Sequence, residues 1–172
     1  MALDPSSLTL AQITVEQTLP LRHEVLWPDL PIEKVKLSED SNGWHFGALM
    51  DGTESAVAVI SLFLEPLPSH AHEIPPENNM GTAAARFRKF ACKSNMQGRG
   101  IGTRLLDHTL HFARTELGAS TVWCDARTST SQWYEKRGFT PFGNKFYKGS
   151  VEYICMKISF SATEVPSVGG KI

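Results

Sequence analysis

Hydrophobic and polar residues alternate along several stretches of the chain, a pattern that predicts β-strands. Residues 9–17 alternate well enough for a first strand, and residues 43–50 and 55–64 flank Asp51-Gly52, a dipeptide typical of a tight hairpin turn. Residues 85–92 set Phe and Ala against Arg and Lys, which indicates a half-buried strand. Further strands are predicted at 121–127, 144–148 and 151–158.

Other stretches have the period of an amphipathic helix. Residues 19–27 place Leu and Val on one face, with Pro20 in the expected first turn. Residues 103–117 form a second such pattern, which Gly118 is expected to end, and 129–137 a short third one. The order βαββ followed by β-turn-α-β-α-ββ predicts an α/β (α+β) fold with a mixed sheet and helices on both faces.

The chain of 172 residues fits one domain, which the pattern places at residues 9–158, with a loose tail at 159–172. Residues 65–83 carry four prolines and show no period. A loop of that length inside a compact domain is usually functional or mobile.

Composition and charge limit the partners and the cellular location that we expect for this protein. Hydrophobic residues make up 41% and the formal net charge is −1, so no global field attracts nucleic acid or an anionic membrane. Cys92, Cys124 and Cys155 lie in strand-like runs and are expected to be reduced thiols. Because there is also no secretion signal and no long apolar run, we expect a cytoplasmic or nuclear protein that is not secreted.

The turn Q-G-R-G-I-G-T at residues 97–103 joins a predicted strand to a predicted helix. The first N–H groups of a helix have no intrahelical partner, and its positive dipole end points at the turn. Gly98, Gly100 and Gly102 leave these amides without covering side chains, so the turn predicts a phosphate-binding site. The alternative is that the glycines only permit a sharp turn and tight helix packing.

Two common phosphate-binding motifs fit poorly. A mononucleotide P-loop closes with Gly-Lys-Ser or Gly-Lys-Thr, whereas this turn closes with Gly-Thr-Arg. A dinucleotide fold would use an acid such as Asp125 on the ribose, but the spacing here is G-x-G-x-G and an antiparallel hairpin precedes the turn. An NAD(P)-binding oxidoreductase therefore stays a remote alternative.

The turn Q-G-R-G-I-G at 97–102, followed by Y-E-K-R-G-F at 134–139, resembles the GNAT superfamily of acyl-CoA-dependent N-acyltransferases. That family carries a [RQ]-x-x-G-x-[GA] turn after its fourth strand and a later Y-E-K-x-G-F, and the similarity covers roughly residues 10–158. The resemblance implies a mostly antiparallel central sheet that splays between strands four and five. It also implies transfer of an acetyl or other short acyl group from acetyl-CoA to a primary amine, by direct attack in a ternary complex.

The resemblance further implies a set of site residues. The coenzyme diphosphate would lie on the turn amides and pantetheine on the free edge of the fourth strand. The implied residues are Phe90, Ala91, Cys92, Gln97, Gly98, Arg99, Gly100, Ile101, Gly102 and Thr103. Tyr134 matches the family tyrosine that is proposed to protonate the departing thiolate, although a tyrosine packed between helix and sheet is the alternative.

The general base is not inherited from the motif. Some relatives use a Glu on the fourth strand, where this chain has Arg88 and Lys89. The candidates are Glu24, His45, Asp125 and Glu152, and a water chain is equally open. No metal is expected, because His70, His72 and Glu73 lack a distant third ligand.

The acceptor amine is only partly constrained. Arg86, Arg88 and Lys89 would repel a polycation and fit a small amine that carries an acidic group. In the family, specificity resides in the first helix with its following loop, here about 19–40, and in the last hairpin. Arg127 replaces an Asn of many relatives and has no assigned role. The resemblance allows a homodimer, and a non-catalytic acyl-CoA-binding module is the alternative function.

Overall fold

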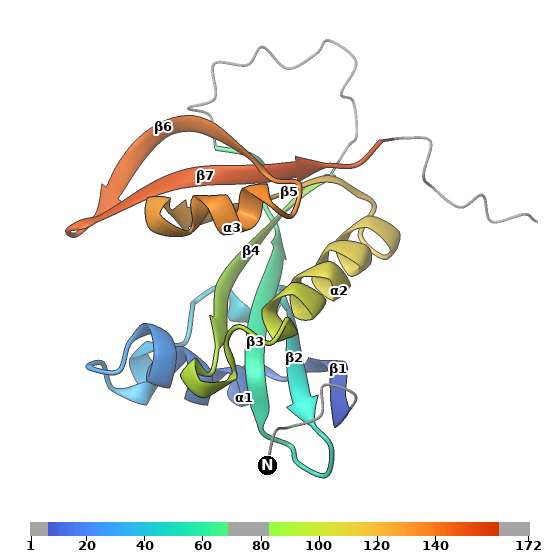
Figure 1. Ribbon diagram of the computed structural model, residues 1–172, viewed down its shortest axis with the longest axis vertical. Coiled ribbons are helices and arrows are strands. Elements are labelled where there is room, and N and C mark those ends of the chain that lie inside the picture. The colour runs from blue at the N-terminus through green and yellow to red at the C-terminus, as the bar shows by residue number, and fades with distance from the viewer. Residues whose placement is uncertain (1–6, 69–82, 162–172) are drawn as a thin grey trace, which may run out of the picture. The chain divides into compact units, whose positions relative to one another are not determined.

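The computed structural model describes residues 7–68 and 83–161. It divides into two compact units, Met1–Leu64 with Arg86–His111 and Glu65–Ala85 with Phe112–Ile172 (Figure 1). We describe each unit by itself. The expected domain limits and the splay between strands four and five therefore remain predictions, and most of the expected tail lies outside the described residues.

Four strands form the sheet of the first unit in the order β1-β2-β3-β4. They are β1 (Leu8–Ile13), β2 (Trp44–Met50), β3 (Ala56–Leu64) and β4 (Ala83–Cys92), of which β4 enters this unit at Arg86. The pairs β1/β2 and β2/β3 are antiparallel. The predicted hairpin at Asp51-Gly52 is confirmed, and Gly52 adopts the left-handed φ of 76° that favours glycine.

The first helix begins earlier than the hydrophobic period predicts. Helix α1 (Val15–Leu21) starts behind Thr14, whose hydroxyl accepts from the Gln17 N–H at 3.3 Å while the Gln17 side chain accepts from the Thr14 N–H at 2.9 Å. This capping box is readable in the sequence, so extending the strand to residue 17 was wrong. Pro20 lies inside the helix rather than in its first turn, and a π-helix, η2 (Arg22–Leu26), continues it.

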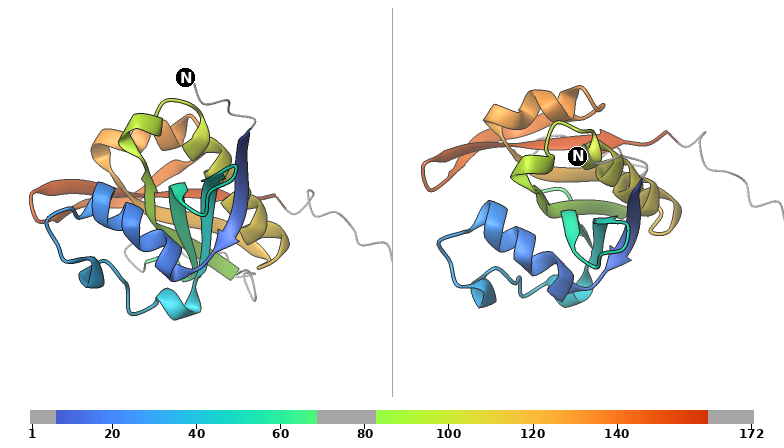
Figure 2. Two further views of the ribbon diagram at one scale, coloured as in Figure 1. Left: turned by 90° about the horizontal axis from the view of Figure 1, so that it is seen from below. Right: turned by 60° about the horizontal axis from the view of Figure 1, so that its bottom comes forward.

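Helices cover both faces of the first sheet. On one face, Leu21 of α1 packs in a core cluster with Ile13, Val59 and Ala91. On the other, α2 (Ile101–Thr115) brings His108 edge-on to Phe46, with ring centres 5.3 Å apart. Figure 2 shows α1, in blue, beside the strands of this unit. The short 3-10 helices of this unit are η3 (Ile32–Lys34), η4 (Asp40–Asn42) and η5 (Ser94–Met96).

The second unit is an antiparallel sheet in the order β5-β7-β6. Its elements are β5 (Ala119–Arg127), η6 (Thr128–Thr130), α3 (Ser131–Glu135), β6 (Thr140–Lys148) and β7 (Val151–Ser159). Trp123, Phe142 and Cys155 form a buried cluster in this unit. Strand β6 begins four residues before the predicted 144, since Thr140, Pro141 and Phe142 already pair with β7 ahead of a register shift between Phe142 and Phe146.

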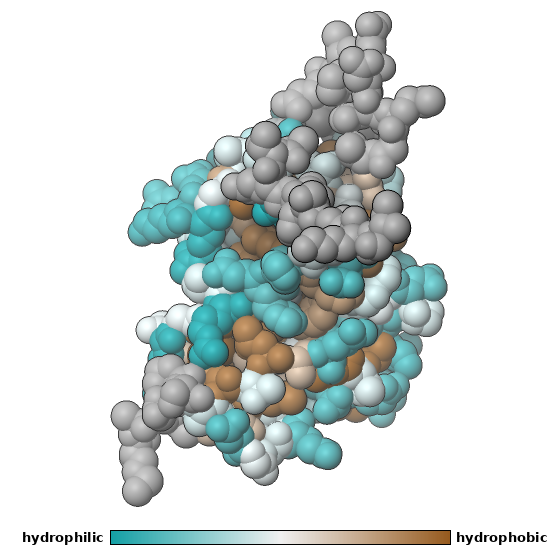
Figure 3. All heavy atoms as spheres, turned by 90° about the vertical axis from the view of Figure 1, so that its right-hand side faces the viewer, coloured by the Kyte–Doolittle hydropathy of each residue, from teal (hydrophilic) through white to brown (hydrophobic). Residues whose placement is uncertain are grey.

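The surface mixes hydrophilic and hydrophobic residues on the face drawn in Figure 3. Among the described residues, the exposed large apolar side chains are Leu30, Ile32, Leu64 and Tyr147. Within residues 7–68 and 83–161, no helix has the length and apolar character needed to cross a membrane.

Candidate functional site

Hydrogen bonds and a buried side chain hold the loop that follows β4 in place. The Lys93 N–H donates to the Val57 carbonyl at 2.8 Å, and the Met96 N–H donates to the Lys93 carbonyl at 2.8 Å. The Met96 side chain is buried, and the Gln97 side-chain amide donates to the Cys92 carbonyl at 3.1 Å. Gln97 therefore ties the turn to the end of β4, a role that the sequence did not reveal.

The glycine turn owes its shape to two of its three glycines. Gly98 and Gly100 have φ values of 73° and 77°, in the region that side chains disfavour, and a Cβ at either position would meet nothing within 4 Å. These two glycines thus permit the turn but do not serve tight packing within the chain. Helix α2 begins at Ile101, two residues before the predicted start at 103, so Gly102 lies in its first turn.

The start of α2 presents backbone rather than side chain. The Arg104 N–H donates to the Gly100 carbonyl at 3.0 Å, which makes Gly100 the N-cap residue directly before Ile101, the first residue of the helix. Gly100 has no side chain to accept from the first-turn N–H groups, which have no partner inside the helix by geometry. The helix dipole adds positive potential there. This arrangement suits an anionic group such as a diphosphate.

Strand β4 contains a left-handed residue that is not glycine, Lys89, with φ 53°. It shifts the alternation of the strand: Phe87 and Phe90, three residues apart, contact each other edge to face at 6.1 Å. Regular alternation would place these two rings on opposite faces. The predicted simple alternation of residues 85–92 is therefore wrong from Lys89 onward. Such strained backbone often accompanies function.

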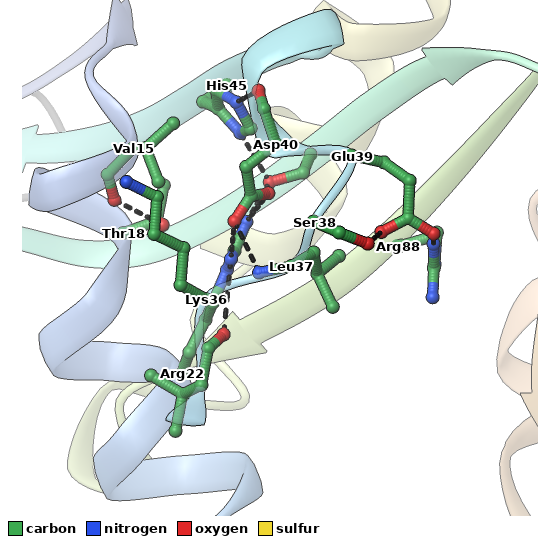
Figure 4. Close-up of polar contacts among 12 residues, drawn as sticks. Val15, Thr18, Arg22, Lys36, Leu37, Ser38, Glu39, Asp40, His45 and Arg88 are labelled. Atoms are coloured by element: carbon green, nitrogen blue, oxygen red, sulfur yellow. Dashed lines mark hydrogen bonds and ion pairs between the residues drawn. The ribbon is translucent and has the colours of Figure 1, made fainter. Parts of the chain in front are cut away.

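A buried ion pair joins the start of η2 to the loop before β2 (Figure 4). The two terminal nitrogens of Arg22 contact the two carboxylate oxygens of Asp40 at 2.7 and 2.8 Å, and both side chains are fully buried. Arg22 also donates to the Val35 carbonyl at 3.3 Å, and Asp40 accepts from the Leu37 N–H at 2.7 Å. Nothing in the local pattern pairs residues 18 positions apart, so sequence reasoning missed this cluster.

His45, one of the candidate bases, belongs to the same cluster. Its Nε2 lies 2.9 Å from the Asp40 carbonyl, which only accepts, so Nε2 donates. Its Nδ1 lies 2.7 Å from Oγ of Ser61, which accepts a hydrogen bond from Arg22 at 2.9 Å. Because both ring nitrogens are engaged and the ring is buried, this geometry does not favour His45 as a base.

We predict that replacing Asp40 by Asn lowers the free energy of unfolding by about 3–5 kcal/mol, because Arg22 keeps a buried charge without its counter-ion. Burial alone would raise the pKa of Asp40, but the hydrogen bonds from Arg22 and Leu37 outweigh it and lower that pKa. The stabilisation is thus present above the ordinary aspartate pKa and is lost as pH falls through the lowered value.

Urea denaturation across acidic pH measures both effects. Glu39→Gln is the matched control: Glu39 is next in sequence and its ion pair with Arg88 is exposed, so the expected loss is below about 1 kcal/mol. Equal losses for the two variants would contradict the assigned role of the buried pair.

The remaining candidate bases differ in their surroundings. Glu24 is exposed on η2. An oxygen of Asp125 lies 2.7 Å from Nζ of Lys148. Glu152 accepts from the Tyr147 hydroxyl at 2.9 Å and pairs with Lys145 at 3.2 Å. These two contacts, with Thr128, lower the pKa of Glu152, which weakens it as a base.

Tyr134 lies on α3 in the second unit, half-buried between the ring edges of Trp133 and Phe139, at 5.1 and 5.6 Å. Burial, with a smaller contribution from Cys124, raises the pKa of Tyr134. The phenol therefore keeps its proton at neutral pH, so it can donate a hydrogen bond or act as an acid but not as a base. Both the acid role and the packing role of Tyr134 remain predictions.

The cysteines are free thiols, as predicted. Cys124 and Cys155 are buried, while Cys92 is half-buried at the end of β4, where burial raises the pKa of its thiol. Across the described part of the chain, no group of three potential metal ligands comes together. His70, His72 and Glu73 lie outside the described residues.

Comparisons with known proteins identify the family. The profile of the acetyltransferase (GNAT) domain matches residues 73–160. An uncharacterized N-acetyltransferase, YitI, of Bacillus subtilis is 31% identical over 141 residues, which cover 81% of this chain and 87% of that protein. This chain therefore belongs to the GNAT acetyltransferase family, whose members transfer acyl groups.

Solved structures agree on the fold. An IAA acetyltransferase from Bacillus cereus superposes with a TM-score of 0.63 at 19% identity, over 90% of this chain and all of that one (100%). A GNAT family acetyltransferase from Elizabethkingia anophelis, with acetyl-CoA bound, gives 0.61 at 13% identity, over 90% and 99%. The predicted α/β GNAT fold is thus confirmed.

Proposed function

We propose that this protein is an N-acetyltransferase that moves an acetyl group from acetyl-CoA to a primary amine of a small molecule. The observation that carries the proposal is the turn at the start of α2, where Gly98 and Gly100 adopt left-handed φ values beside open space. In a member of the GNAT family, that turn is suited to the coenzyme diphosphate. The fit depends on backbone amides, so no basic side chain is required.

In this proposal, each group of residues has a separate role. The turn residues Gln97, Gly98, Arg99, Gly100, Ile101, Gly102 and Thr103 hold the diphosphate, and Phe90, Ala91 and Cys92 offer strand-edge groups to pantetheine. The unprotonated amine attacks the thioester carbonyl; a C–N bond forms, the C–S bond breaks and the sulfur leaves as a thiolate. A backbone N–H of the strand edge stabilises the developing oxyanion, and Tyr134 supplies the proton to the thiolate.

None of the four predicted candidates is favoured as the base that takes the proton of the amine: Glu24 is exposed, and Asp125 pairs with Lys148. His45 has both nitrogens engaged and Glu152 has a lowered pKa. We therefore propose that water carries this proton. The protein would act in the cytoplasm on small molecules, without nucleic acid or membrane partners, and alone or as a homodimer.

We predict that acetyl-CoA binds the protein in calorimetry and that adding amines releases free thiol. The panel contains 4-aminobutanoate and butylamine, L-phenylalanine and phenethylamine, glucosamine, spermidine and a short peptide. Thiol release with at least one amine, above the rate with acetyl-CoA alone, is the expected result. Absence of acetyl-CoA binding would remove the proposed site.

A non-catalytic acyl-CoA-binding module is the second candidate. Arg88 and Lys89 in place of a strand carboxylate favour it, because no base is then inherited. The same panel separates the two functions, since the module binds acetyl-CoA but releases no thiol with any amine. The oxidoreductase alternative is set aside, because the chain belongs to an acyltransferase family.

A further inference from the structure

Two consecutive residues of β4 contact the same segment, residues 27–43, which follows η2. Nη1 of Arg88 lies 3.3 Å from a carboxylate oxygen of Glu39, and Nζ of Lys89 lies 3.8 Å from the centre of the Trp27 ring. Consecutive side chains of a regular strand point to opposite faces. The left-handed backbone of Lys89 removes that restriction. It therefore places two positive charges beside each other on the α1 face of the strand.

The neighbours of β4 agree with this assignment of faces. Before Lys89, Arg88 lies near the Phe63 ring at 6.0 Å, and Phe63 faces His45, which belongs to the Arg22 cluster. After Lys89, Ala91 packs with Leu21 of α1. Residues of even number thus face α1 before Lys89, and residues of odd number face it from Lys89 onward, so both cations fall on this side.

Buried hydrogen bonds fix the part of residues 27–43 that faces these cations. Asp40, the residue after Glu39, is fixed by Arg22 at 2.7 and 2.8 Å and by the Leu37 N–H at 2.7 Å. Figure 4 shows Glu39 beside this buried cluster, with Ser38 on one side and Arg88 on the other. The surface that faces Arg88 is therefore preorganised, and a ligand bound there need not order it.

The ion pair between Glu39 and Arg88 leaves room for a second carboxylate at Arg88. Glu39 already contacts Arg88, and its side chain is 53% exposed, so solvent weakens this pair and a second carboxylate can share or replace it. The other acids of η2 and the segment, Glu24, Asp29 and Glu33, are exposed and screened by solvent. Arg88, at 23% exposed, is screened less.

We propose that Arg88 and Lys89 recognise a carboxylate on the acceptor, which makes the substrates small primary amines that carry an acid, such as amino acids. The inference rests on the proposed function and names the substrate class of the same site. The guanidinium of Arg88 offers a planar pair of donors to a carboxylate, and Lys89 adds a point charge held against Trp27. A polycationic acceptor would meet repulsion from both.

The test compares amines that differ only by the acid: 4-aminobutanoate against butylamine, and L-phenylalanine against phenethylamine. We expect kcat/KM to be at least about 10-fold higher for the acid-bearing member of a pair. Lys89→Met and Arg88→Met should each reduce that advantage about 10-fold, mainly through KM, and leave the acid-free amines within about 2-fold. Lys89→Arg should retain most of the preference, and acetyl-CoA affinity in calorimetry should not change.

Matched controls remove cations that also lie over aromatic rings elsewhere. Lys157→Met removes an ammonium 5.2 Å from the Phe142 ring, and Arg114→Met a guanidinium 5.7 Å from the Phe160 ring. Both should keep the wild-type preference. Transfer confined to acid-free amines or spermidine would overturn the inference, as would an equal loss on both members of a pair. Bound acetyl-CoA without thiol release from any amine would instead refute the proposed function.

Discussion

Gly100→Glu is expected to weaken acetyl-CoA binding by at least about 100-fold, the loss of roughly 3 kcal/mol of binding free energy. The new carboxylate would lie at the start of α2, where it competes for the first-turn N–H groups and repels the diphosphate. A Cβ at this position meets nothing within 4 Å, so the change adds charge and backbone strain without a clash at Cβ. Isothermal calorimetry measures the affinity, and far-ultraviolet circular dichroism reports the fold.

Gly52→Glu is the matched control for strain. Gly52 has a φ of 76° against 77° for Gly100, and its Cβ position is equally open, but it lies in the β2–β3 hairpin. Each substitution should cost about 1 kcal/mol of stability, because a side chain is placed in the left-handed region. Only Gly100→Glu should lose acetyl-CoA. Equal affinities for both variants and the wild type would refute the turn as the coenzyme site.

The parts of the fold that the sequence predicts well are those that depend on neighbouring residues. Asp51-Gly52 marks a hairpin because its turn needs a left-handed residue, and Gly118, with φ 64°, forms the left-handed turn between α2, which ends at Thr115, and β5. The turn at Gly98 and Gly100 was predictable on the same basis. In each case one local backbone requirement selects one residue type.

The features that could not be predicted from the sequence depend on partners far along the chain. Arg22 and Asp40 are buried only because they meet each other and Ser61, which no periodic pattern reveals. The shift at Lys89 is hidden for a related reason, since lysine has no preference for a left-handed backbone and the surrounding sheet must impose it. The start of α1 is different, because the Thr14–Gln17 capping box was present and the strand-like alternation obscured it.

The route by which the amine loses its proton determines the pH dependence of turnover. If water takes the proton of the amine, the rate should follow the unprotonated fraction of the acceptor and rise with pH toward the pKa of that amine. A buried carboxylate base would instead give a plateau well below that value. For an acceptor whose carboxylate is held by Arg88 and Lys89, the pH dependence of the rate would still follow the pKa of the acceptor's own amine.

Tyr134→Phe is expected to lower kcat by about 100-fold or more, the range of general acid catalysis, and to change acetyl-CoA affinity by less than about 2-fold. The substitution keeps the ring contacts with Trp133 and Phe139 and removes only the hydroxyl. Because burial raises the pKa of Tyr134 above its ordinary value of 10.0, the wild-type enzyme should show no alkaline loss of turnover from this group below about pH 10.

Tyr147→Phe provides the comparison, because it removes a phenol that is 65% exposed on β6. Its turnover should stay near the wild-type level, measured by thiol release with the best amine of the panel. If Tyr134 serves packing alone, Tyr134→Phe would keep its kcat and its stability would change little, since the ring remains. A normal kcat for Tyr134→Phe would therefore remove the acid role while leaving the coenzyme site at Gly100 intact.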